Sequence, residues 1–449
     1  MAIEEPAEAY TWLDRPVAPW ACLAAWALAT ALFFGVLAAS GGIAIGDMAS
    51  TESGALTFAH GEPHCAFPAN VHAEAPLYPL LAAGVLVVTR PGGSVPFPSG
   101  RAMAGACDHS ASAVRLWMAH SRSVQGVAHV GLIVWFPLLA GFVLVLRAAG
   151  RGRRRSEVVG VLVLAVLPPV QATLHTFFHP EDLLAMGLVL GSLAAALRSR
   201  WFVAGVVVGL AVTAQPFALL AAVPLVVVSP SRVRPRVGLG GVIGVGVVAV
   251  PVVLVTYHGL ADAFFSAGTF LPTPPTLIGI LHLPTAALGV VSRVVPVVGA
   301  ALLAGWARHR MGDGVLRPDR LVAVVGMALG FRLVTEVLFW GYYLAAVAVM
   351  LLVVEMVTGR LRVATVAFFV LCGVFFPLVG GGGPLVNAAD DHLAVLQVVL
   401  VGWALALLSG PLRTSRRPPW MTVSPGADPP YAHPISAGRC GGSPLVEDR

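Results

Sequence analysis

Long apolar runs separated by short arginine clusters are the feature that most limits what this chain can fold into. An α-helix needs about 20 apolar residues to cross the hydrocarbon core of a bilayer. Runs close to that length fall near residues 20–39, 127–146, 158–178, 238–257 and 286–305, and further ones follow up to residue 409. The chain is 57% hydrophobic with a mean hydropathy of +0.84, whereas a soluble domain is about 45–50% apolar. We therefore expect an all-α, polytopic membrane bundle of about 11–13 segments.

The arginine clusters predict how these segments are oriented. They occur at residues 151–155, 198–200, 232–236, 308–310, 360–362 and 413–417, each in a short stretch beside an apolar run. Because cytoplasmic loops are enriched in Lys and Arg, we expect all six clusters to face the cytoplasm. This topology explains the net charge of +6, so the charge does not indicate a nucleic-acid partner.

Three regions follow from this orientation. Residues 1–19 are too polar for a cleaved signal peptide, and we expect them to form a cytoplasmic N-terminal segment. Residues 20–410 form the transmembrane region, in which residues 40–125 make one long extracytoplasmic loop. Within this loop Leu77–Thr89 is apolar but short for a span, so we expect it to dip into the membrane. Residues 411–449 are rich in Pro, Gly and Ser and are predicted to be a disordered cytoplasmic tail.

Two cysteines of the long loop, Cys65 and Cys107, lie in polar stretches. An extracytoplasmic loop is in an oxidising compartment, where a disulfide between them would persist. Two free thiols fit the sequence equally well. A metal site with His64 and His109 as further ligands is less favoured, because the four residues lack the close spacing of such sites. We expect no metal and no cofactor.

Residues 179–182, with the sequence His-Pro-Glu-Asp, concentrate ionisable groups between two apolar runs. Proline followed by two acids is an ordinary helix start, since acids are stabilised at the N-terminal end of the helix dipole. The alternative is a functional site, because ionisable residues in membrane segments are rare and commonly functional. Gln171 and His175 precede His179 at spacings of four residues, which predicts a polar stripe on one face of the preceding helix.

A second polar group consists of Arg332, Glu336 and Tyr343. One helix face aligns all three if the helix continues through residues 339–341. Charged residues in an apolar run are usually paired. Arg332 and Glu336 therefore form either a structural ion pair or a site in which Arg332 binds a lipid phosphate.

A break is expected at Gln215-Pro216, in the middle of the apolar stretch from Trp201 to Ser229. Arginines flank this stretch at both ends, yet it is too short for two full crossings. We expect two short or re-entrant halves that meet at Gln215.

Several acids follow the first apolar run. Asp47 lies close to the expected outer boundary, where a loop acid or helix N-cap explains it as well as a function does. Glu52, Glu62 and Glu74 follow in the same loop, and we expect all three to be solvated.

Together these features resemble a known class of membrane enzyme. They are the uncleaved first helix, the long first outer loop with an acid near its start, the dozen or so helices, the break at Gln215-Pro216, the His-Pro-Glu-Asp segment and the Arg332…Glu336…Tyr342-Tyr343 segment. Over residues 20–410 the chain resembles the polyprenyl-phosphate-sugar-dependent membrane glycosyltransferases of the GT-C class, most of all actinobacterial mannosyl- and arabinosyltransferase-like members.

The resemblance implies a reaction and a set of residues. A sugar, mannose or an arabinose-like one, would pass from a polyprenyl-phosphate donor to a cell-envelope glycan or glycolipid acceptor on the extracytoplasmic face of the cell membrane. The acid near the end of the first helix would be the catalytic base, Arg332 would hold the phosphate, and His-Pro-Glu-Asp would orient the sugar or acceptor. The residues expected to take part in catalysis are Asp47, His179, Glu181 and Asp182. Those expected to bind substrate are Arg332, Glu336, Tyr343, Gln215 and His175.

Two other classes stay open. A multi-pass secondary transporter would also have about a dozen spans and a broken helix, although residues 20–230 and 238–409 show no convincing repeat. A lipid-linked glycan ligase or polymerase would have its large outer loop late in the chain, whereas here the large loop comes first. The sequence identifies neither the sugar nor the acceptor.

Overall fold

The computed structural model describes residues 11–40, 48–59, 75–89, 130–256, 276–278, 280, 283–336, 341–375 and 393–413. In these ranges the chain is helical and forms no strand, apart from an isolated bridge between Pro16 and Arg154. The longer helices are α1 (Pro19–Ala39), α2 (Met48–Ala59), α3 (Leu77–Thr89), α7 (Trp135–Ala148), α8 (Arg155–Val166), α9 (Pro168–His175), α10 (Pro180–Leu197), α11 (Trp201–Ala214), α12 (Leu219–Val228), α13 (Arg234–Thr256), α15 (Thr285–Met311), α16 (Pro318–Thr335), α17 (Leu344–Thr358), α18 (Val363–Phe375) and α20 (Leu393–Leu408). Short helical turns complete the set: η1 (Trp12–Asp14), η4 (Leu132–Val134), η5 (Pro216–Ala218), η7 (Gly312–Leu316), η8 (Gly341–Tyr343) and α21 (Gly410–Arg413).

Helices long and apolar enough to cross a membrane confirm the predicted class. Five described segments meet that requirement, and seven shorter apolar helices of 10–17 residues accompany them. The five are Pro19–Ala39, Arg155–His175, Pro180–Leu197, Arg234–Thr256 and Val291–Leu316. The described part of the chain is therefore all-α, with several helices that are suited to cross a membrane. Contacts divide the chain into two units, Met1–Arg413 and Thr414–Arg449. Residues 411–413 of the predicted tail are helical in α21, contrary to the prediction, and the rest of the tail lies outside the described residues.

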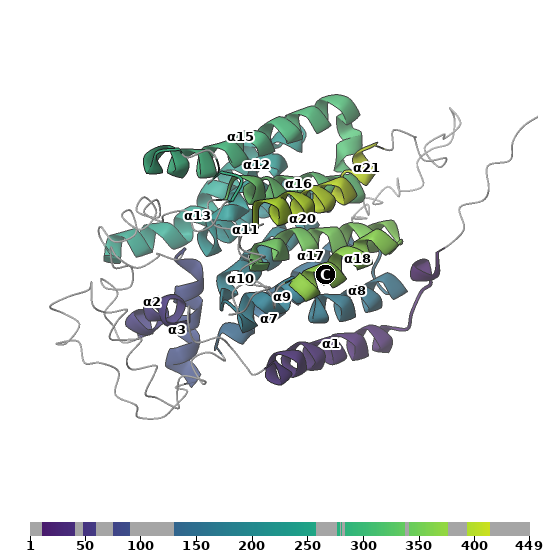
Figure 1. Ribbon diagram of the computed structural model, residues 1–449, viewed down its shortest axis with the longest axis horizontal. Coiled ribbons are helices and arrows are strands. Elements are labelled where there is room, and N and C mark those ends of the chain that lie inside the picture. Colours follow the sequence, from purple (N-terminus) through teal and green to yellow (C-terminus); the bar gives the residue numbers. More distant parts are fainter. Residues whose placement is uncertain are drawn as a thin grey trace, which may run out of the picture. The chain divides into compact units, whose positions relative to one another are not determined.

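Arginine-containing ends of several helices meet at one end of the bundle. The backbone N–H of Val17, just before α1, donates to the carbonyl of Arg153 between α7 and α8. Arg151 Nε donates to the carbonyl of Val357 at the end of α17 (2.7 Å), and Arg362 Nη2 donates to the carbonyl of Leu407 at the end of α20 (3.1 Å). We call this region the arginine-rich end. In Figure 1 these helices lie side by side. Helices α2 and α3 lie near the other end of the bundle.

Glycines show which way α11 to α13 run. A Cβ atom added to Gly205 or Gly209 of α11 would lie 2.2–2.3 Å from a backbone oxygen of α13, at Val237 and Gly241 respectively. Such close helix contacts are typical of small residues spaced by four in membrane helices. Residue numbers rise together along the contact, so α11 and α13 are parallel. Helix α12, which lies between them in the sequence, runs in the opposite direction. The expected break is confirmed, because Gln215 is extended (φ −158°, ψ 127°) between α11 and η5.

The apolar run at residues 158–178 is interrupted, contrary to the prediction of one helix. α8 ends at Val166, Leu167 is extended (φ −64°, ψ 117°), and α9 begins at Pro168. Proline has no N–H to donate and disfavours the helical conformation of the residue before it. The interruption therefore follows from Pro168.

The predicted polar stripe through Gln171, His175 and His179 is wrong for a related reason. α9 ends at His175, and Phe178 adopts a left-handed conformation (φ 52°) that turns the chain. His179 thus precedes α10 and does not continue α9. Gln171 donates through Nε2 to backbone carbonyls near the interruption, including that of Ala165, which gives it a structural role.

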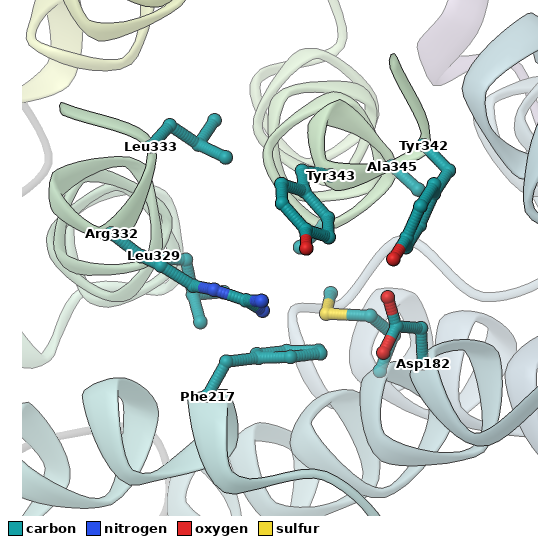
Figure 2. Close-up of a pocket in the computed structure, with 10 residues that line it drawn as sticks. Asp182, Phe217, Leu329, Arg332, Leu333, Tyr342, Tyr343 and Ala345 are labelled. Carbon is teal, nitrogen blue, oxygen red and sulfur yellow. The ribbon is translucent and has the colours of Figure 1, made fainter. Parts of the chain in front are cut away.

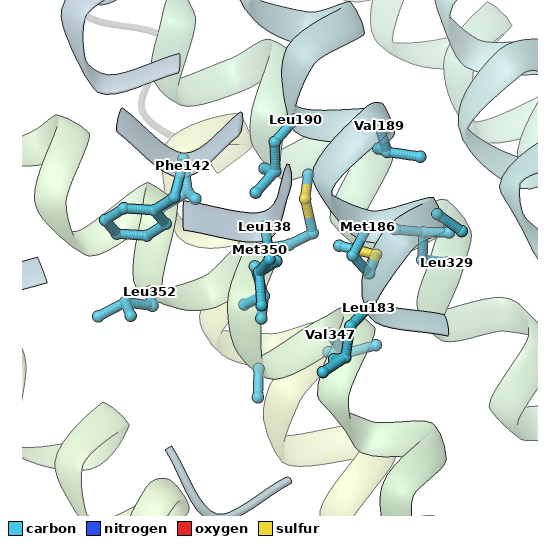
Figure 3. Close-up of a cluster of buried hydrophobic side chains, with 14 of the residues drawn as sticks. Leu138, Phe142, Leu183, Met186, Val189, Leu190, Leu329, Val347, Met350 and Leu352 are labelled. Carbon is cyan, nitrogen blue, oxygen red and sulfur yellow. The ribbon is translucent and has the colours of Figure 1, made fainter. Parts of the chain in front are cut away.

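A packed apolar core joins α7, α10, α16 and α17 (Figure 3). Phe142, Met186 and Met350 are at most 1% exposed within it. α7 and α10 approach so closely that a Cβ atom on Gly141 would lie 2.2 Å from the carbonyl oxygen of Gly187. Met186 also lines the pocket described below. The pocket therefore lies directly against this core.

Candidate functional site at the ends of α10, α11, α16 and α17

A pocket lies among helix ends that come from four separate parts of the chain (Figure 2). The start of α10, η5, the end of α16 and the segment from η8 into α17 supply its walls. The enclosed cavity is small, about 10 Å³, and the pocket opens beyond it at its mouth. The lining residues are Asp182, Met186, Phe217, Leu329, Arg332, Leu333, Tyr342, Tyr343, Ala345 and Ala346.

The pocket and the arginine-rich end lie at opposite ends of α17. Tyr343 and Leu344 begin this helix beside the pocket, whereas Val357 near its end binds Arg151. The 15 residues of α17 correspond to about 22 Å at 1.5 Å per residue. The pocket is therefore well separated from the arginine clusters.

The start of α10 brings one acid into the pocket. His179 is the N-cap residue, Pro180 occupies the first turn, and Glu181 and Asp182 follow it, as the sequence predicts. Asp182 is 6% exposed, and its Oδ1 accepts a hydrogen bond of 2.7 Å from Gln215 Nε2. The extended backbone at the break places Gln215 for this contact, so the break and the acid belong to one site.

Arg332 supplies the positive charge from the last turn of α16. Its Nε donates to Glu336 Oε2 at 2.7 Å, which confirms the predicted pairing. The condition for one shared helix face is not met, however, because α16 ends at Thr335 and Glu336 is extended (φ −73°, ψ 133°). Tyr343 still reaches Arg332, although no single helix face carries both residues.

Aromatic rings hold the guanidinium on both sides. Its central carbon lies 4.6 Å from the ring centre of Tyr343 and 5.3 Å from that of Phe217, at cation–π distance. Figure 2 shows the group pointing between these rings into the space that faces Asp182. Within the described residues Arg332 donates only through Nε to another side chain. Its terminal nitrogens, which carry four of its five N–H donors, are therefore available to a ligand.

The ring of Tyr342 joins His179 to the same pocket. The rings of His179 and Tyr342 stack with centroids 4.4 Å apart and an interplanar angle of 12°. His179 Nδ1 lies 2.7 Å from Glu181 Oε1. Burial raises the pKa of the Tyr342 and Tyr343 hydroxyls above the ordinary value. Both tyrosines therefore stay protonated near neutral pH and can donate hydrogen bonds.

Some predicted site residues do not line this pocket. His175, at the end of α9, and Glu336, which binds Arg332 from behind, are not among the lining residues. Asp47, Cys65 and Cys107 lie outside the described residues. In the part of the chain that the structure describes, no group of three His, Cys, Asp or Glu side chains is arranged to hold a metal ion.

The sequence reasoning missed three residues near the site. Phe217 directly follows the predicted break, and Tyr342 precedes Tyr343, so both were adjacent to recognised signals. Glu52 was expected to be solvated, which is wrong. It is fully buried (0% exposed), and Tyr78 Oη donates to its Oε1 at 2.5 Å. The signal for this burial was the apolar segment Leu77–Thr89, which carries Tyr78.

Comparison with known proteins gives no relative: no family model, no curated protein and no solved structure matches this chain. The chemistry of the pocket is therefore the basis for a functional conclusion.

Proposed function

We propose that the protein is an integral membrane glycosyltransferase that moves a sugar from a polyprenyl-phosphate donor to a cell-envelope glycan or glycolipid. The observation that carries this proposal is the pairing of Asp182 with Arg332 in one aromatic-walled pocket, away from the arginine-rich end. Sugar transfer from a lipid phosphate needs a base for the acceptor hydroxyl and a cation for the departing phosphate. The pocket offers one group for each need.

Arg332 fits the role of phosphate ligand. Guanidinium groups bind phosphate through two parallel N–H donors, with geometric specificity as well as charge. The bond from Nε to Glu336 and the rings of Phe217 and Tyr343 fix the orientation of its terminal nitrogens. A fixed donor pair stabilises charge as it develops on the leaving phosphate, without reorganisation during the reaction.

Asp182 fits the role of general base among the described residues. Gln215 holds Oδ1, which leaves Oδ2 to meet the acceptor. As the acceptor oxygen bonds to the anomeric carbon, the bond from that carbon to the phosphate oxygen breaks and the phosphate leaves with the electron pair. The acceptor proton passes to the carboxylate. Asp47 of the first loop remains the alternative base.

The rest of the pocket fits a sugar attached to a lipid. The rings of Phe217, Tyr342 and Tyr343 offer flat faces for the C–H groups of a sugar ring. Leu329, Leu333 and Ala345 form an apolar wall. The pocket therefore combines polar and apolar surfaces of the kind that ligand sites use.

The proposal includes the extracytoplasmic face. If the arginine-rich end is cytoplasmic, the pocket at the other end opens to the outer side. Ser40 and Ser231 are both exposed and lie after α1 and before α13, respectively. In intact cells, a membrane-impermeant thiol reagent should label Ser40→Cys and not Ser231→Cys, and the reverse pattern would invert the assigned orientation.

Secondary transport is the second candidate, because broken helices near a charged site are typical of secondary transporters. The break at Gln215 beside Asp182 is the observation that favours it. A lipid-linked glycan ligase or polymerase would use the same pocket for a longer donor.

One reconstituted system separates these functions. Purified protein in proteoliposomes is given a polyprenyl-phosphate monosaccharide, labelled in the sugar, together with a panel of octyl glycoside acceptors. Transfer of label to an acceptor that depends on Asp182 and Arg332 supports the proposal. Uptake of free sugar without transfer would favour a transporter, and transfer from oligosaccharide donors alone would favour a ligase.

A further inference from the structure

A second buried acid lies on α2, outside the lining of the pocket. Glu52 of α2 is 0% exposed, and Tyr78 of α3, 1% exposed, binds its Oε1. Its other oxygen, Oε2, has no hydrogen-bond partner among the described residues. Because buried polar atoms are nearly always bonded, this open oxygen calls for an explanation.

Contacts place the Glu52–Tyr78 pair beside the turn before α10. A Cβ atom on Gly131 would lie 3.2 Å from Tyr78 Oη and 2.7 Å from the ring of Phe178. Phe178 directly precedes His179. Helix α3 therefore packs next to the segment that presents His179 and Glu181.

Glu181, like Glu52, is a buried acid with one side-chain oxygen that has no hydrogen-bond partner among the described residues. It is 1% exposed, and its Oε2 has no partner in the described part of the chain, while Oε1 binds His179 Nδ1. Its neighbour Asp182 lines the pocket, whereas Glu181 does not. The first turn of α10 thus carries one acid that faces the pocket and a second that holds His179.

Two nearby buried carboxyl groups disfavour each other's ionisation, as burial already does. Burial raises the pKa of Glu52 to about 8, the hydrogen bond from Tyr78 opposes this rise, and the charge of Glu181 adds to it. Tyr78 from α3 and Glu181 from α10 are thus the titratable groups that act on Glu52. Glu52 therefore holds its proton at neutral pH and adds no negative charge beside Glu181.

We propose that Glu52 is a positioning residue: as a neutral carboxylic acid it leaves undisturbed the contact by which Glu181 holds His179 against Tyr342 of the pocket wall. The catalytic part of this inference rests on the proposed function. When Glu52 releases its proton to water, a negative charge arises beside Glu181. The contact between Glu181 and His179 is then disturbed, His179 loses its orientation against Tyr342, and turnover falls.

Infrared spectroscopy tests the protonation state without any need for activity. The purified protein in nanodiscs should show a carbonyl stretch of a protonated carboxylic acid at pH 7 that disappears as the pH rises through about 8. Glu52→Gln should lack this band, whereas Asp313→Asn, at an exposed acid beside Arg308, should keep it. A band that persists in Glu52→Gln, or that is absent from the wild type at pH 7, would overturn the assignment.

The pH dependence of transfer tests the positioning role. Wild-type turnover should be about tenfold lower at pH 9 than at pH 7, as expected for a single group with a pKa near 8. Glu52→Gln mimics the neutral acid, so it should keep turnover at pH 7 and lose the alkaline decline. Tyr78→Phe removes the bond that lowers the pKa of Glu52, so its decline should move to higher pH.

Two results would contradict the positioning role. One is a decline in folded Glu52→Gln that equals that of the wild type. The other is a loss of turnover at pH 7 of more than about 100-fold in Glu52→Gln, the scale of a group that transfers the proton itself. If the wild type transfers no sugar at all, the proposed function fails, while the infrared result still decides whether Glu52 is protonated.

Discussion

The two ends of the bundle use the same residue types in opposite ways. At the arginine-rich end, Glu355 is 0% exposed and accepts hydrogen bonds from Thr365 Oγ1 and the backbone N–H of Arg362, both at 2.8 Å, and from the Arg362 side chain. At the pocket end, Glu52 and Glu181 each leave one buried oxygen without a partner in the described residues. Within the same described residues, Arg332 binds one acid through one nitrogen.

This difference separates structure from function. A buried ion pair whose atoms are all bonded fastens helix ends, and removal of one partner destabilises the fold. Open donors and acceptors in a buried site cost stability and are expected where a ligand completes the bonding. We therefore interpret the arginine-rich end as a structural contact between helix ends, and the pocket end as a ligand-binding site.

The largest effect is expected at Asp182. Asp182→Asn keeps the size of the side chain and its contact with Gln215 but removes the basic form, so turnover should fall about 10²–10⁴-fold. Radiolabel transfer from the polyprenyl-phosphate sugar measures it, with Asp313→Asn as the matched control at an exposed acid. If Asp182→Asn stays active while Asp47→Asn loses turnover in equally folded protein, the base is Asp47.

Arg332→Ala should mainly weaken donor binding. Loss of a charge-assisted contact of about 1.5–3 kcal/mol corresponds to a rise in the donor Kd of roughly 10- to 150-fold. Arg332→Lys keeps the charge without the planar fork, so it should restore only part of the affinity. Donor binding that is unchanged in both variants would remove Arg332 from the site.

The opposite behaviour is expected of Arg362 at the arginine-rich end. Arg362→Ala leaves Glu355 with fewer donors and should lower the free energy of unfolding by about 1.5–3 kcal/mol. Denaturant titration measures this loss, and the KM for the donor should stay the same in the folded fraction. A changed KM with unchanged stability would break the division between the two ends.

The smallest effect concerns the stack between His179 and Tyr342. Such aromatic pairs contribute about 0.5–1.5 kcal/mol beyond area burial, so Tyr342→Leu should reduce kcat/KM by roughly 2- to 12-fold. Tyr342→Phe keeps the ring and should stay near the wild type. Equal losses in both variants would assign the effect to the hydroxyl instead.

Much of the fold was predictable from local signals. Apolar length predicted the positions of α1, α13, α15 and α20, and a proline predicted the turn at Gln215. The errors came from applying helical periodicity across breaks. The stripe through His175 and His179 fails because the chain turns at Phe178, and the shared face of Arg332, Glu336 and Tyr343 required a helix that instead ends at Thr335.

The candidate site was predictable only as separate pieces. The sequence indicated Asp182, Gln215, Arg332 and Tyr343, but spacing cannot show that residues 182 and 332 line one pocket, because that depends on how α10, α16 and α17 pack. Glu52 was misjudged for the same reason. An acid in a polar stretch looks solvated until a distant helix, here α3 with Tyr78, covers it.

The most direct test of the central claim is to locate a bound polyprenyl phosphate. A photoreactive short-chain polyprenyl phosphate is crosslinked to the protein in nanodiscs, and the labelled peptides are mapped by mass spectrometry. We predict label near the start of α10, the end of α16 and the start of α17, displaced by unlabelled polyprenyl phosphate and strongly reduced in Arg332→Ala. Specific label confined to the arginine-rich end, and unaffected by Arg332→Ala, would contradict the assignment of the pocket as the donor site.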